Sequence, residues 1–356
     1  MTTNNDQVLV QPEQAKTFIV DVLQNAGISK ENATIMANAM VLADLRGVDT
    51  HGINRLPGYL ARIKTGVVNP NPTLEIKQKS PAMAHIDAKH TFGFIASHMA
   101  IEKAIEMASI YGVGIVGVKD SGHYGMAATW LLQAIEKGYG CLAFTNAARS
   151  MPAWGSKEPL LGTSPFAVGL PGRKNGDFIL DMSPSIVARG KIRKAERRGE
   201  SIPEGWALDE EGKVTTNPTK ALKGIVLPIG GPKGSGLAMM MDIFGGLLTG
   251  SSFGGRVNDH FKDLDKTQGL GHWFMIFKPE MFLDSKEEYC EKMDILMNDI
   301  RTSEKAIGIE RIYTPGEIED LKWNIQRETG ISFTRLEIDN LNGVAEEWYC
   351  TTRLPL

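Results

Sequence analysis

The spacing of apolar side chains predicts helices at the start of the chain. Apolar residues recur every three to four positions over residues 15–23 and 33–40, and glycine follows each run, at Gly27 and Gly47. Residues 69–72 then read Asn-Pro-Asn-Pro, and a residue that precedes proline is disfavoured in a helix. We therefore predict a helical N-terminal domain over residues 1–72.

Beyond residue 72 short β-rich runs alternate with helical patterns. Strands are predicted at residues 73–78, 114–119, 140–145, 178–182, 225–229, 271–277 and 309–313. Helices are predicted at residues 95–111, 126–137, 187–198, 236–248, 287–303 and 316–329. The alternation indicates an α/β fold class, although the connections 145–178 and 198–225 are too long for a simple doubly wound sheet.

Composition narrows the class of protein. The 356 residues carry 39 Lys and Arg against 42 Asp and Glu, which argues against a nucleic-acid partner. The three cysteines are widely spaced, so they fit neither a disulfide framework nor a zinc site, and the histidines lack the spacing of metal ligands. We expect a cytoplasmic protein without a metal, and neither an export signal nor a membrane span is apparent.

One glycine motif has the wrong context for a nucleotide site. Residues 112–117 read Gly-Val-Gly-Ile-Val-Gly and match the dinucleotide fingerprint G-x-G-x-x-G. In that fingerprint a strand precedes the glycines and a helix follows them. Here a predicted helix precedes them and they begin a predicted strand, so we interpret the motif as a helix end that leads into a buried strand.

A second glycine-rich segment is a better phosphate site. Residues 230–236 read Gly-Gly-Pro-Lys-Gly-Ser-Gly and lie between the apolar run 225–229 and an apolar helix. This order places backbone N–H groups, the positive end of a helix dipole and Lys233 where an anion can bind. A flexible turn with a solvated lysine is an equally good interpretation of these residues alone.

The densest group of reactive side chains lies at residues 49–59. His51, Arg55 and Tyr59 would share one face of a helix, whereas Pro57 favours a helix that begins near Leu56 and leaves His51 in the preceding loop. An imidazole can transfer a proton near neutral pH, and a guanidinium binds a carboxylate through two hydrogen bonds. Together they suit a 2-oxo or 2-hydroxy acid, although a capping histidine and a solvated arginine would give the same pattern.

A second candidate histidine follows a predicted buried strand. His123 lies in residues 120–125, Asp-Ser-Gly-His-Tyr-Gly, just before a predicted helix. Loops at strand ends often carry catalytic groups. A structural role, in which Ser121 or His123 caps the helix, is equally compatible with the pattern.

Several short stretches occur in a characteristic order along the chain. They are residues 51–55, 121–125, 145–146, 151–155, 161–167, 181–185, 188–191, 231–237 and 315–317. In this order they resemble the type-2 malate/L-lactate dehydrogenase family of NAD(P)-dependent oxidoreductases. That family also includes ureidoglycolate, sulfolactate and diketogulonate dehydrogenases and cyclic-imine reductases.

The resemblance implies a fold and an assembly. It implies a non-Rossmann cofactor domain with a mostly antiparallel sheet, joined to a helical domain, in a protein that works as a homodimer. We accordingly expect residues 73–317 to form the α/β domain that binds NAD(P) and carries out catalysis. Residues 318–356 are expected to join the helical domain.

The resemblance also implies which residues bind each ligand. The residues expected to line NAD or NADP are Asp181, Met182, Ser183, Ser185, Pro232, Lys233, Gly234, Pro315, Gly316 and Glu317. The residues expected near the substrate are Arg55, Tyr59 and Asn146, with His51 or His123 facing the reacting carbon. We rank His51 first as the proton donor because it lies four residues from Arg55. Asp181 or Asp44 is expected to hold the donor's other ring nitrogen.

Some positions depart from the family pattern. Ser164 replaces a common Asn, and Ser183 and Pro184 replace a common Ala-Thr pair, so these cofactor contacts transfer less safely. The expected activity is hydride transfer between the nicotinamide and C2 of a small 2-oxo or 2-hydroxy acid such as malate or lactate. The alternatives are a cyclic-imine carboxylate reductase of the same fold and a non-catalytic nucleotide-binding protein.

Overall fold

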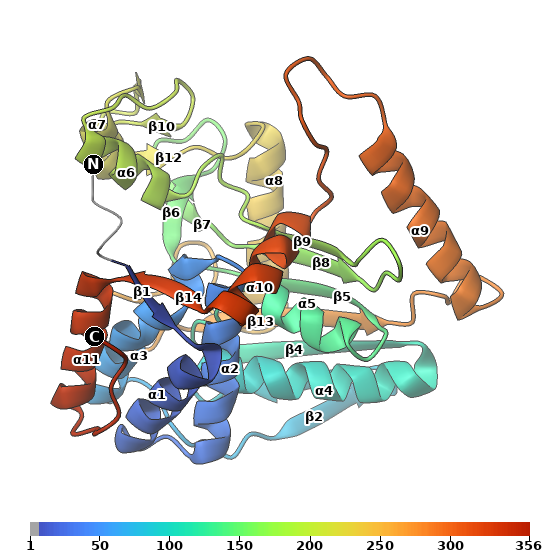
Figure 1. The fold of residues 1–356 in the computed structure, drawn as a ribbon, viewed down its shortest axis with the longest axis horizontal. Coiled ribbons are helices and arrows are strands. Elements are labelled where there is room, and N and C mark those ends of the chain that lie inside the picture. Colours follow the sequence, from blue (N-terminus) through green and yellow to red (C-terminus); the bar gives the residue numbers. More distant parts are fainter. Residues whose placement is uncertain (1–6) are drawn as a thin grey trace.

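A seven-stranded sheet forms the centre of the molecule. The structure, a computed structural model, describes residues 7–356, and the strand order is β2-β3-β4-β13-β5-β8-β9 (Figure 1). The strands are β2 (Ile76–Ser80), β3 (Met83–Asp87), β4 (Val113–Ser121), β13 (Leu270–Phe277), β5 (Gly140–Thr145), β8 (Phe166–Leu170) and β9 (Phe178–Met182). In this sheet β3 and β4 run parallel, and the other neighbouring pairs are antiparallel. The mostly antiparallel, non-Rossmann sheet is therefore confirmed.

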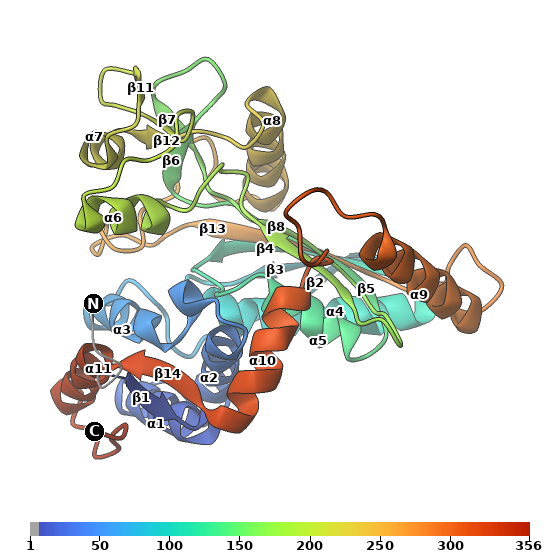
Figure 2. The same ribbon diagram turned by 45° about the horizontal axis from the view of Figure 1, so that its top comes forward.

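Two helices, α4 (Gly93–Tyr111) and α5 (Ala128–Ile135), cover one face of this sheet (Figure 2). Helix α4 ends at Gly112, whose φ of +81° is the left-handed conformation that glycine adopts at helix ends, and β4 begins at the next residue. A Cβ on Gly114 would lie 2.1 Å from the carbonyl oxygen of Ala104, so the strand packs closely against the helix. The interpretation of the first glycine motif as a helix end and a strand is confirmed.

The N-terminal part of the described chain is mainly helical. Its elements are β1 (Gln7–Val10), α1 (Pro12–Asn25), α2 (Lys30–Leu45), the 3-10 turns η1 (Asp49–His51) and η2 (Ile53–Arg55), and α3 (Leu56–Lys64). The Ser29 hydroxyl accepts the N–H of Asn32 and so caps the start of α2. Pro57 lies in the first turn of α3, where its missing N–H costs little. The helix therefore begins at Leu56, and His51 lies in the preceding segment.

The C-terminal segment returns to these helices. It comprises α10 (Glu317–Thr329), β14 (Ile331–Thr334) and α11 (Arg335–Glu347). Strand β14 pairs antiparallel with β1, and α10 and α11 lie beside the N-terminal elements (Figure 1). Arg46, which is buried at the end of α2, donates to Asp320 at 2.5 Å and to the carbonyl oxygen of Gly316 at 3.3 Å. The two ends of the described chain thus pack against each other.

A smaller substructure lies on the other side of the sheet. Its elements are β6 (Arg149–Pro152), β7 (Pro159–Gly162), α6 (Arg189–Arg198), β10 (Ala207–Leu208), β11 (Val214–Thr215), α7 (Pro218–Lys223), β12 (Ile225–Val226), α8 (Pro232–Met241) and the π-helix η3 (Asp242–Leu247). A small apolar core around Ile192 and Val226 joins α6, α7 and β12. The helix predicted at 236–248 is observed as α8 followed by η3, so it begins four residues earlier than predicted and has π geometry in its second half.

Helix α9 (Lys286–Thr302) extends along one side of the molecule and is followed by a long loop (Figures 1 and 2). The prediction of a strand at 309–313 is wrong, because these residues belong to that loop. Ile309 and Tyr313 are largely exposed, so this run has no sheet to pack against. None of the helices between residues 7 and 356, α9 included, is long and apolar enough to cross a membrane.

Candidate active site

The fold brings together the reactive side chains that were singled out near residues 51–59 and 123. His51 comes from η1, Arg55 from η2, Tyr59 from α3 and His123 from the loop that follows β4. The His51 and His123 rings stack with their centroids 5.5 Å apart. The Tyr59 hydroxyl lies 2.8 Å from Nδ1 of His123. Groups 64 residues apart in sequence thus form one cluster.

Asp44 anchors the segment that carries His51 and Arg55. Its carboxyl group is buried in α2 and accepts the N–H of Ile53 at 2.8 Å. A Cβ on Gly52 would lie 1.7 Å from an Asp44 oxygen, so only glycine fits between η1 and η2. Burial raises the pKa of Asp44 to about 8, helped by the charges of Asp49 and Glu337 and opposed by the Ile53 hydrogen bond. Asp44 is therefore mostly uncharged at neutral pH.

Backbone contacts determine which nitrogen of His123 carries the proton. The N–H of Gly125 points to Nδ1 of His123 at 3.3 Å, and a backbone N–H can only donate. Nδ1 is therefore the acceptor, the Tyr59 hydroxyl donates to the same atom, and the proton of the neutral ring is on Nε2. The backbone of this residue is also held, because its carbonyl oxygen accepts the N–H of Gly93 at 3.1 Å.

The expected carboxylate partner of the histidines is absent from these contacts. The Nδ1 atom of His51 lies 2.9 Å from the Thr50 hydroxyl, and that of His123 meets Tyr59. The Asp181 carboxylate instead accepts the N–H of Ala128 at 2.8 Å, at the start of α5. The prediction that Asp181 or Asp44 orients the proton donor is therefore wrong, because both carboxyl groups hold backbone segments.

The surroundings keep the two imidazoles uncharged. Desolvation, and then the charge of Arg55, lowers the pKa of His51 to about 4. Desolvation, Arg55 and the neighbouring imidazoles lower the pKa of His123 well below its usual value. Burial raises the pKa of Tyr59, so its phenol stays protonated and donates to His123.

The guanidinium group of Arg55 is held in place while its terminal nitrogens stay available. Its Nε donates to the carbonyl oxygen of Thr50 at 2.6 Å, and its Cζ lies 5.0 Å from the centroid of the Phe261 ring. Within residues 7–356 its two terminal nitrogens make no hydrogen bond. These two donors have the geometry that binds a carboxylate in bidentate fashion.

A third imidazole, that of His260, joins the cluster and was not found from the sequence. Its ring centroid lies 5.2 Å from that of Tyr59 and 5.8 Å from that of His123. It comes from residues 248–269, which connect η3 to β13, and Phe261 beneath Arg55 belongs to the same connection. No spacing signal marks these residues, because their role depends on long-range packing. Across the described chain, no group of three or more His, Cys, Asp or Glu side chains is arranged to hold a metal ion.

Asn146, which was expected near the substrate, is buried and fully engaged. Its side-chain nitrogen donates to the carbonyl oxygen of Ser252 at 2.6 Å. Its side-chain oxygen accepts the N–H of Gly271 at 3.1 Å. The amide thus ties the end of β5 to the backbone on both sides of the 253–270 region.

The three segments expected to line the cofactor meet along β9. Ser185 forms a β-bridge with Pro228, and the N–H of Ile229 donates to the carbonyl oxygen of Pro184 at 2.8 Å. The residues that follow β9 therefore lie beside the glycine-rich turn. On the other side, the N–H of Ile179 donates to the carbonyl oxygen of Pro315 at 3.1 Å. The bond from Ala128 to Asp181 links this region to the His123 loop.

The glycine-rich turn only partly matches the expected anion site. Gly230 and Gly231 have φ angles of +58° and +62°, and α8 begins directly after them. The backbone N–H groups of Gly231, Lys233, Gly234 and Ser235 donate to protein carbonyls. The expected cradle of free N–H groups is therefore wrong at these four positions. The exposed ammonium group of Lys233 and the positive end of the helix dipole remain for an anion.

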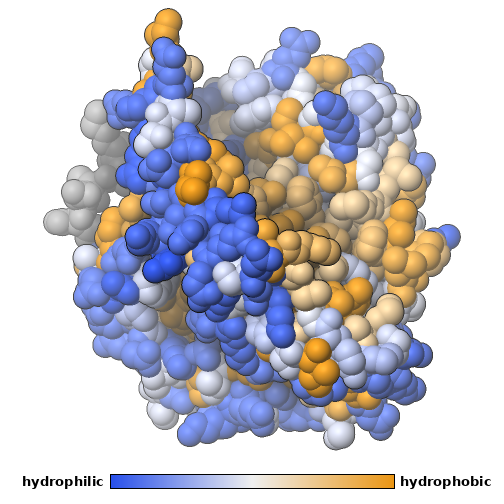
Figure 3. Space-filling model, turned by 90° about the vertical axis from the view of Figure 1, so that its right-hand side faces the viewer, coloured by the Kyte–Doolittle hydropathy of each residue, from blue (hydrophilic) through white to orange (hydrophobic). Residues whose placement is uncertain are grey.

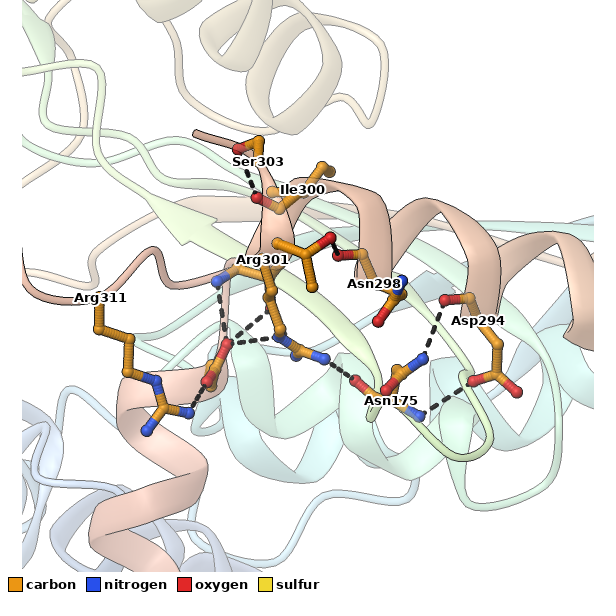
Figure 4. Close-up of polar contacts among 10 residues, drawn as sticks. Asn175, Asp294, Asn298, Ile300, Arg301, Ser303 and Arg311 are labelled. Carbon is orange, nitrogen blue, oxygen red and sulfur yellow. Dashed lines mark hydrogen bonds and ion pairs between the residues drawn. The ribbon is translucent and has the colours of Figure 1, made fainter. Parts of the chain in front are cut away.

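Glu317 is the first residue of α10, and its carboxylate accepts from Arg301 and Arg311, which are labelled in Figure 4. Its carboxylate accepts from Nε of Arg301 at 2.8 Å, from the backbone and hydroxyl of Thr314 at 3.1 Å, and from Arg311. Desolvation opposes its ionisation, but these hydrogen bonds prevail and lower its pKa to about 2. Arg301 also donates to the carbonyl oxygen of Asn175, so the network joins α9 to the β8–β9 hairpin. Both oxygens of Glu317 are used within the protein.

The fold, with its mostly antiparallel sheet, is shared with a known class of dehydrogenases. The chain belongs to the malate/L-lactate dehydrogenase family, whose family model matches residues 10–342. The family resemblance stated from the sequence is therefore confirmed.

Relatives across this family have several substrates and cofactors in their names. An L-sulfolactate dehydrogenase from Methanocaldococcus jannaschii is 38% identical over 96% of this chain and 97% of its own length. A (2R)-3-sulfolactate dehydrogenase (NADP(+)) from Chromohalobacter salexigens is 35% identical over 80% of this chain and 85% of its own. A ureidoglycolate dehydrogenase (NAD(+)) from Escherichia coli K12 is 32% identical over 88% and 89%.

Solved structures show the same fold. The sulfolactate dehydrogenase from M. jannaschii superposes with a TM-score of 0.91 at 37% identity, over 96% of this chain and 98% of that one. A delta1-piperideine-2-carboxylate reductase from Pseudomonas syringae superposes with a TM-score of 0.85 at 26% identity, over 95% and 100%. Dehydrogenases and an imine reductase thus share this architecture.

Proposed function

We propose that this chain is an NAD(P)-dependent dehydrogenase that transfers a hydride between the nicotinamide and C2 of a small 2-oxo or 2-hydroxy acid, as with malate or lactate. The observation that carries the proposal is the cluster of one guanidinium group with free donors, Arg55, and two imidazoles, His51 and His123. In a 2-oxo acid the reacting carbonyl is bonded to the carboxylate. An anion-binding group and a proton donor must therefore lie side by side, and Arg55 with the imidazoles of His51 and His123 would meet this requirement.

Arg55 is proposed to bind the substrate carboxylate. Its Nε is already bound to the Thr50 carbonyl, and the Phe261 ring lies beneath the guanidinium plane. The two terminal nitrogens therefore point in a direction set before the substrate arrives, which reduces the entropy lost on binding. Tyr59 is proposed to lie near the substrate and to act mainly by holding His123.

The contacts favour His123 over His51 as the proton donor, the reverse of the order expected from the sequence. His123 is held at Nδ1 by Tyr59 and Gly125 and carries its proton on Nε2, the atom left for the substrate oxygen. The only polar contact of the His51 ring within the described residues is with the hydroxyl of its neighbour Thr50. His51 stacks on His123 and is proposed to orient it.

The charge of the substrate is proposed to control the proton. In the free protein Arg55 contributes to the low pKa of both His51 and His123, so neither ring holds an extra proton at neutral pH. A carboxylate bound to Arg55 offsets that positive charge and raises the pKa of the adjacent rings. Anion binding should therefore be accompanied by uptake of one proton, which on His123 enters at Nδ1, where the Tyr59 hydroxyl can then accept it. The Nε2–H can next protonate the substrate oxygen and leave a neutral ring.

NAD or NADP is proposed to bind along β9 and the two helix starts beside it. The proposed residues are Asp181, Met182, Ser183, Ser185, Pro232, Lys233, Gly234, Pro315, Gly316 and Glu317. A bound nicotinamide would supply or accept the hydride. The exposed Lys233 at the start of α8 suits a pyrophosphate, whereas Glu317 is proposed to act through the loop that it holds, because Arg301 and Arg311 occupy its carboxylate.

A single assay tests the activity. NADH and NADPH oxidation would be followed by absorbance against a panel of 2-oxo acids and cyclic imines. Turnover with pyruvate, oxaloacetate or sulfopyruvate would support the proposal. Cofactor binding without turnover of any of these compounds would favour the non-catalytic alternative and overturn it.

A cyclic-imine carboxylate reductase is the second candidate, supported by the likeness to the piperideine-carboxylate reductase. Its substrate also carries a carboxylate for Arg55, but an iminium arrives already protonated and needs less acid catalysis. Neutral imidazoles, the state of His51 and His123 in the free protein, would suffice for such a substrate. A reductase rate that survives replacement of His123, with an imine as substrate, would select this candidate.

We also propose a homodimer. Exposed apolar side chains lie along α8 and η3, among them Met239, Ile243 and Leu247, and along α9, where Ile295 and Leu296 are exposed. Figure 3 looks at the right-hand side of the molecule as drawn in Figure 1, and apolar side chains gather on this side. A second copy would cover such a surface. Sedimentation velocity should give twice the mass of the chain, and a monomer at micromolar concentration would contradict this proposal.

A further inference from the structure

His260 is a buried imidazole beside the proposed proton donor, and the mechanism above gives it no role. It is 7% exposed, and its ring lies against those of Tyr59 and His123. A buried imidazole costs desolvation energy unless its nitrogens have partners. Its contacts therefore indicate what it does.

Gln268 connects His260 to His123. The Gln268 side-chain oxygen accepts the backbone N–H of His123 at 2.9 Å. Because a backbone N–H can only donate, the amide must present its oxygen here. The same oxygen lies 3.3 Å from Nδ1 of His260. An oxygen of this kind only accepts, so Nδ1 of His260 carries a proton and the neutral ring has its lone pair on Nε2.

The segment that carries these residues is fixed to α3. Arg62 is 1% exposed and donates to the carbonyl oxygens of His260 at 3.1 Å, Asp263 at 3.3 Å and Lys266 at 2.6 Å. Three charge-assisted hydrogen bonds from one buried side chain hold this connection against the helix that bears Tyr59. The His260 and Gln268 side chains therefore start from a fixed backbone.

The direction of the His260 ring argues against direct proton transfer to a substrate. Its Nε2 lies over Gly58 of α3, where a Cβ would be 3.2 Å away. This atom has no hydrogen-bond partner within the described chain. Nε2 thus faces the helix backbone, while Nδ1 faces Gln268 and the His123 loop.

We propose that His260 and Gln268 are positioning residues: His260 holds the Gln268 amide, and the Gln268 oxygen fixes the backbone of His123 so that its Nε2–H points to the substrate oxygen. The proposal rests on the proposed function of His123 and deepens it. It explains why two polar side chains from the 248–269 connection are buried under the active site.

The charged and titratable groups around His260 keep it neutral. Arg55 and Arg62 face it from η2 and α3, His123 from the loop after β4, and Asp259 precedes it in its own segment. Desolvation is the largest effect and, with the two arginines, lowers the pKa of His260 to about 4, while Gln268 and Asp259 oppose this. The neutral Nδ1–H form should therefore persist across the range in which the enzyme is assayed.

NMR of ¹⁵N-histidine-labelled protein tests the hydrogen-bond arrangement without any activity. Long-range ¹⁵N–¹H correlation spectra at neutral pH should show His260 as the Nδ1–H tautomer and His123 as the Nε2–H tautomer, assigned by single substitutions. His260 in the Nε2–H form would overturn the proposal. This result does not depend on which substrate the protein uses.

Kinetics of variants tests the positioning role. His260→Phe keeps the ring but removes the donor, and should lower kcat about three- to tenfold, the equivalent of one neutral hydrogen bond, with the cofactor KM within about twofold. His260→Asn retains an N–H donor and should restore most of the loss. The adjacent Phe261→Leu is the matched control, since it should raise the KM for the acid more than it lowers kcat.

A charge change adds a readout that misfolding cannot imitate. Gln268→Glu retains the acceptor but adds a negative charge, which should raise the pKa of His260 and His123. The alkaline limb of the kcat profile for reduction, where the proton donor loses its proton, should therefore move to higher pH. An active parent whose kcat and pH profile are unchanged in both His260→Phe and Gln268→Glu would overturn the proposal. A parent that is inactive with all 2-oxo acids and imines would instead refute the proposed function. The NMR assignment of the His260 tautomer would still test the hydrogen-bond arrangement in that case.

Discussion

The imidazole cluster and the glycine-rich turn prepare for their ligands in opposite ways. In the cluster, buried groups from four parts of the chain hold one another, and Tyr59, Gly125 and Gln268 all contact His123. At the turn, the N–H groups of the first helical residues are used internally, and Lys233 is exposed. The cluster therefore has its geometry before any ligand binds, whereas the turn offers a single exposed charge. Changes in the cluster should alter rates, and changes at the turn should alter affinity modestly.

The largest effect is expected from the proton donor. His123→Asn keeps much of the shape but cannot titrate, so kcat for reduction of a 2-oxo acid should fall roughly 10²–10⁴-fold. The neutral-range pH dependence of kcat should disappear, while the dissociation constant of the cofactor changes little. Steady-state kinetics across pH and cofactor titration by fluorescence would measure these effects.

His51→Asn is the matched control for that experiment. Its effect should be smaller, because His51 is proposed to orient the ring of His123 by stacking on it. If His51→Asn abolishes turnover and His123→Asn does not, the order proposed from the contacts is wrong. If neither matters, the proton comes from another group.

Next in size is the loss of the bidentate carboxylate contact. Arg55→Lys keeps the charge but loses the planar pair of donors and the stacking on Phe261. The value of kcat/KM for the acid should fall by an amount of order 2–4 kcal/mol. Unchanged kinetics with oxaloacetate and pyruvate would show that Arg55 does not bind the substrate carboxylate.

The sequence predicted the parts of the cluster that depend on local chemistry. His51, Arg55 and Tyr59 lie within nine residues, and the proline rule placed the helix start at Leu56, as the structure confirms. The rejection of the first glycine motif succeeded for the same reason, since the order of helix and strand is a local property. Strands β5 and β9 match their predicted ranges because their apolar runs pack within the sheet.

Long-range packing could not be predicted in the same way. Strand β8 was missed because its short run, Phe-Ala-Val-Gly-Leu, has no alternation of apolar and polar residues and becomes a strand only between β5 and β9. Strand β14 forms by pairing with β1 at the opposite end of the chain. Neither His260 nor Gln268 carries a spacing signal, since the connection that bears them is held by Arg62. The internal hydrogen bonds of the glycine-rich turn likewise depend on its actual φ angles.

The pH dependence of stability distinguishes an uncharged, buried Asp44 from an ionised one. The pKa of Asp44 is about 8 in the folded protein and near 3.8 when unfolded, so the folded state binds more protons between these values. The free energy of unfolding of the parent should therefore decrease as pH rises from about 4 to 8, because Asp44 must then ionise in a buried position. Asp44→Asn is neutral throughout and should lack that loss. Its stability relative to the parent should increase by roughly 1–3 kcal/mol between pH 5 and pH 8.

Urea unfolding of Asp44→Asn and of the parent at several pH values gives the difference in their free energies of unfolding. The contributions of the other titrating groups are common to both proteins and cancel in this difference. Thr34→Ala, at a half-buried position in the same helix, controls for general effects of substitution in α2. A constant difference between Asp44→Asn and the parent across this range would mean that Asp44 is ionised in the folded protein.

The smallest effect is expected at the turn. Lys233→Ala removes an exposed charge from the start of α8 and should raise the cofactor KM only a few-fold, because an exposed charge at a helix end contributes about 0.3–1 kcal/mol. The KM for the acid should stay within about twofold. Added salt screens this attraction, so cofactor binding should weaken with salt less steeply in the variant than in the parent.

Lys223→Ala, in α7, is a suitable control for net charge. Equal salt dependence in the parent and Lys233→Ala would remove Lys233 from the cofactor site. A change in kcat larger than the change in cofactor KM would mean that the turn, like the imidazole cluster, sets the rate.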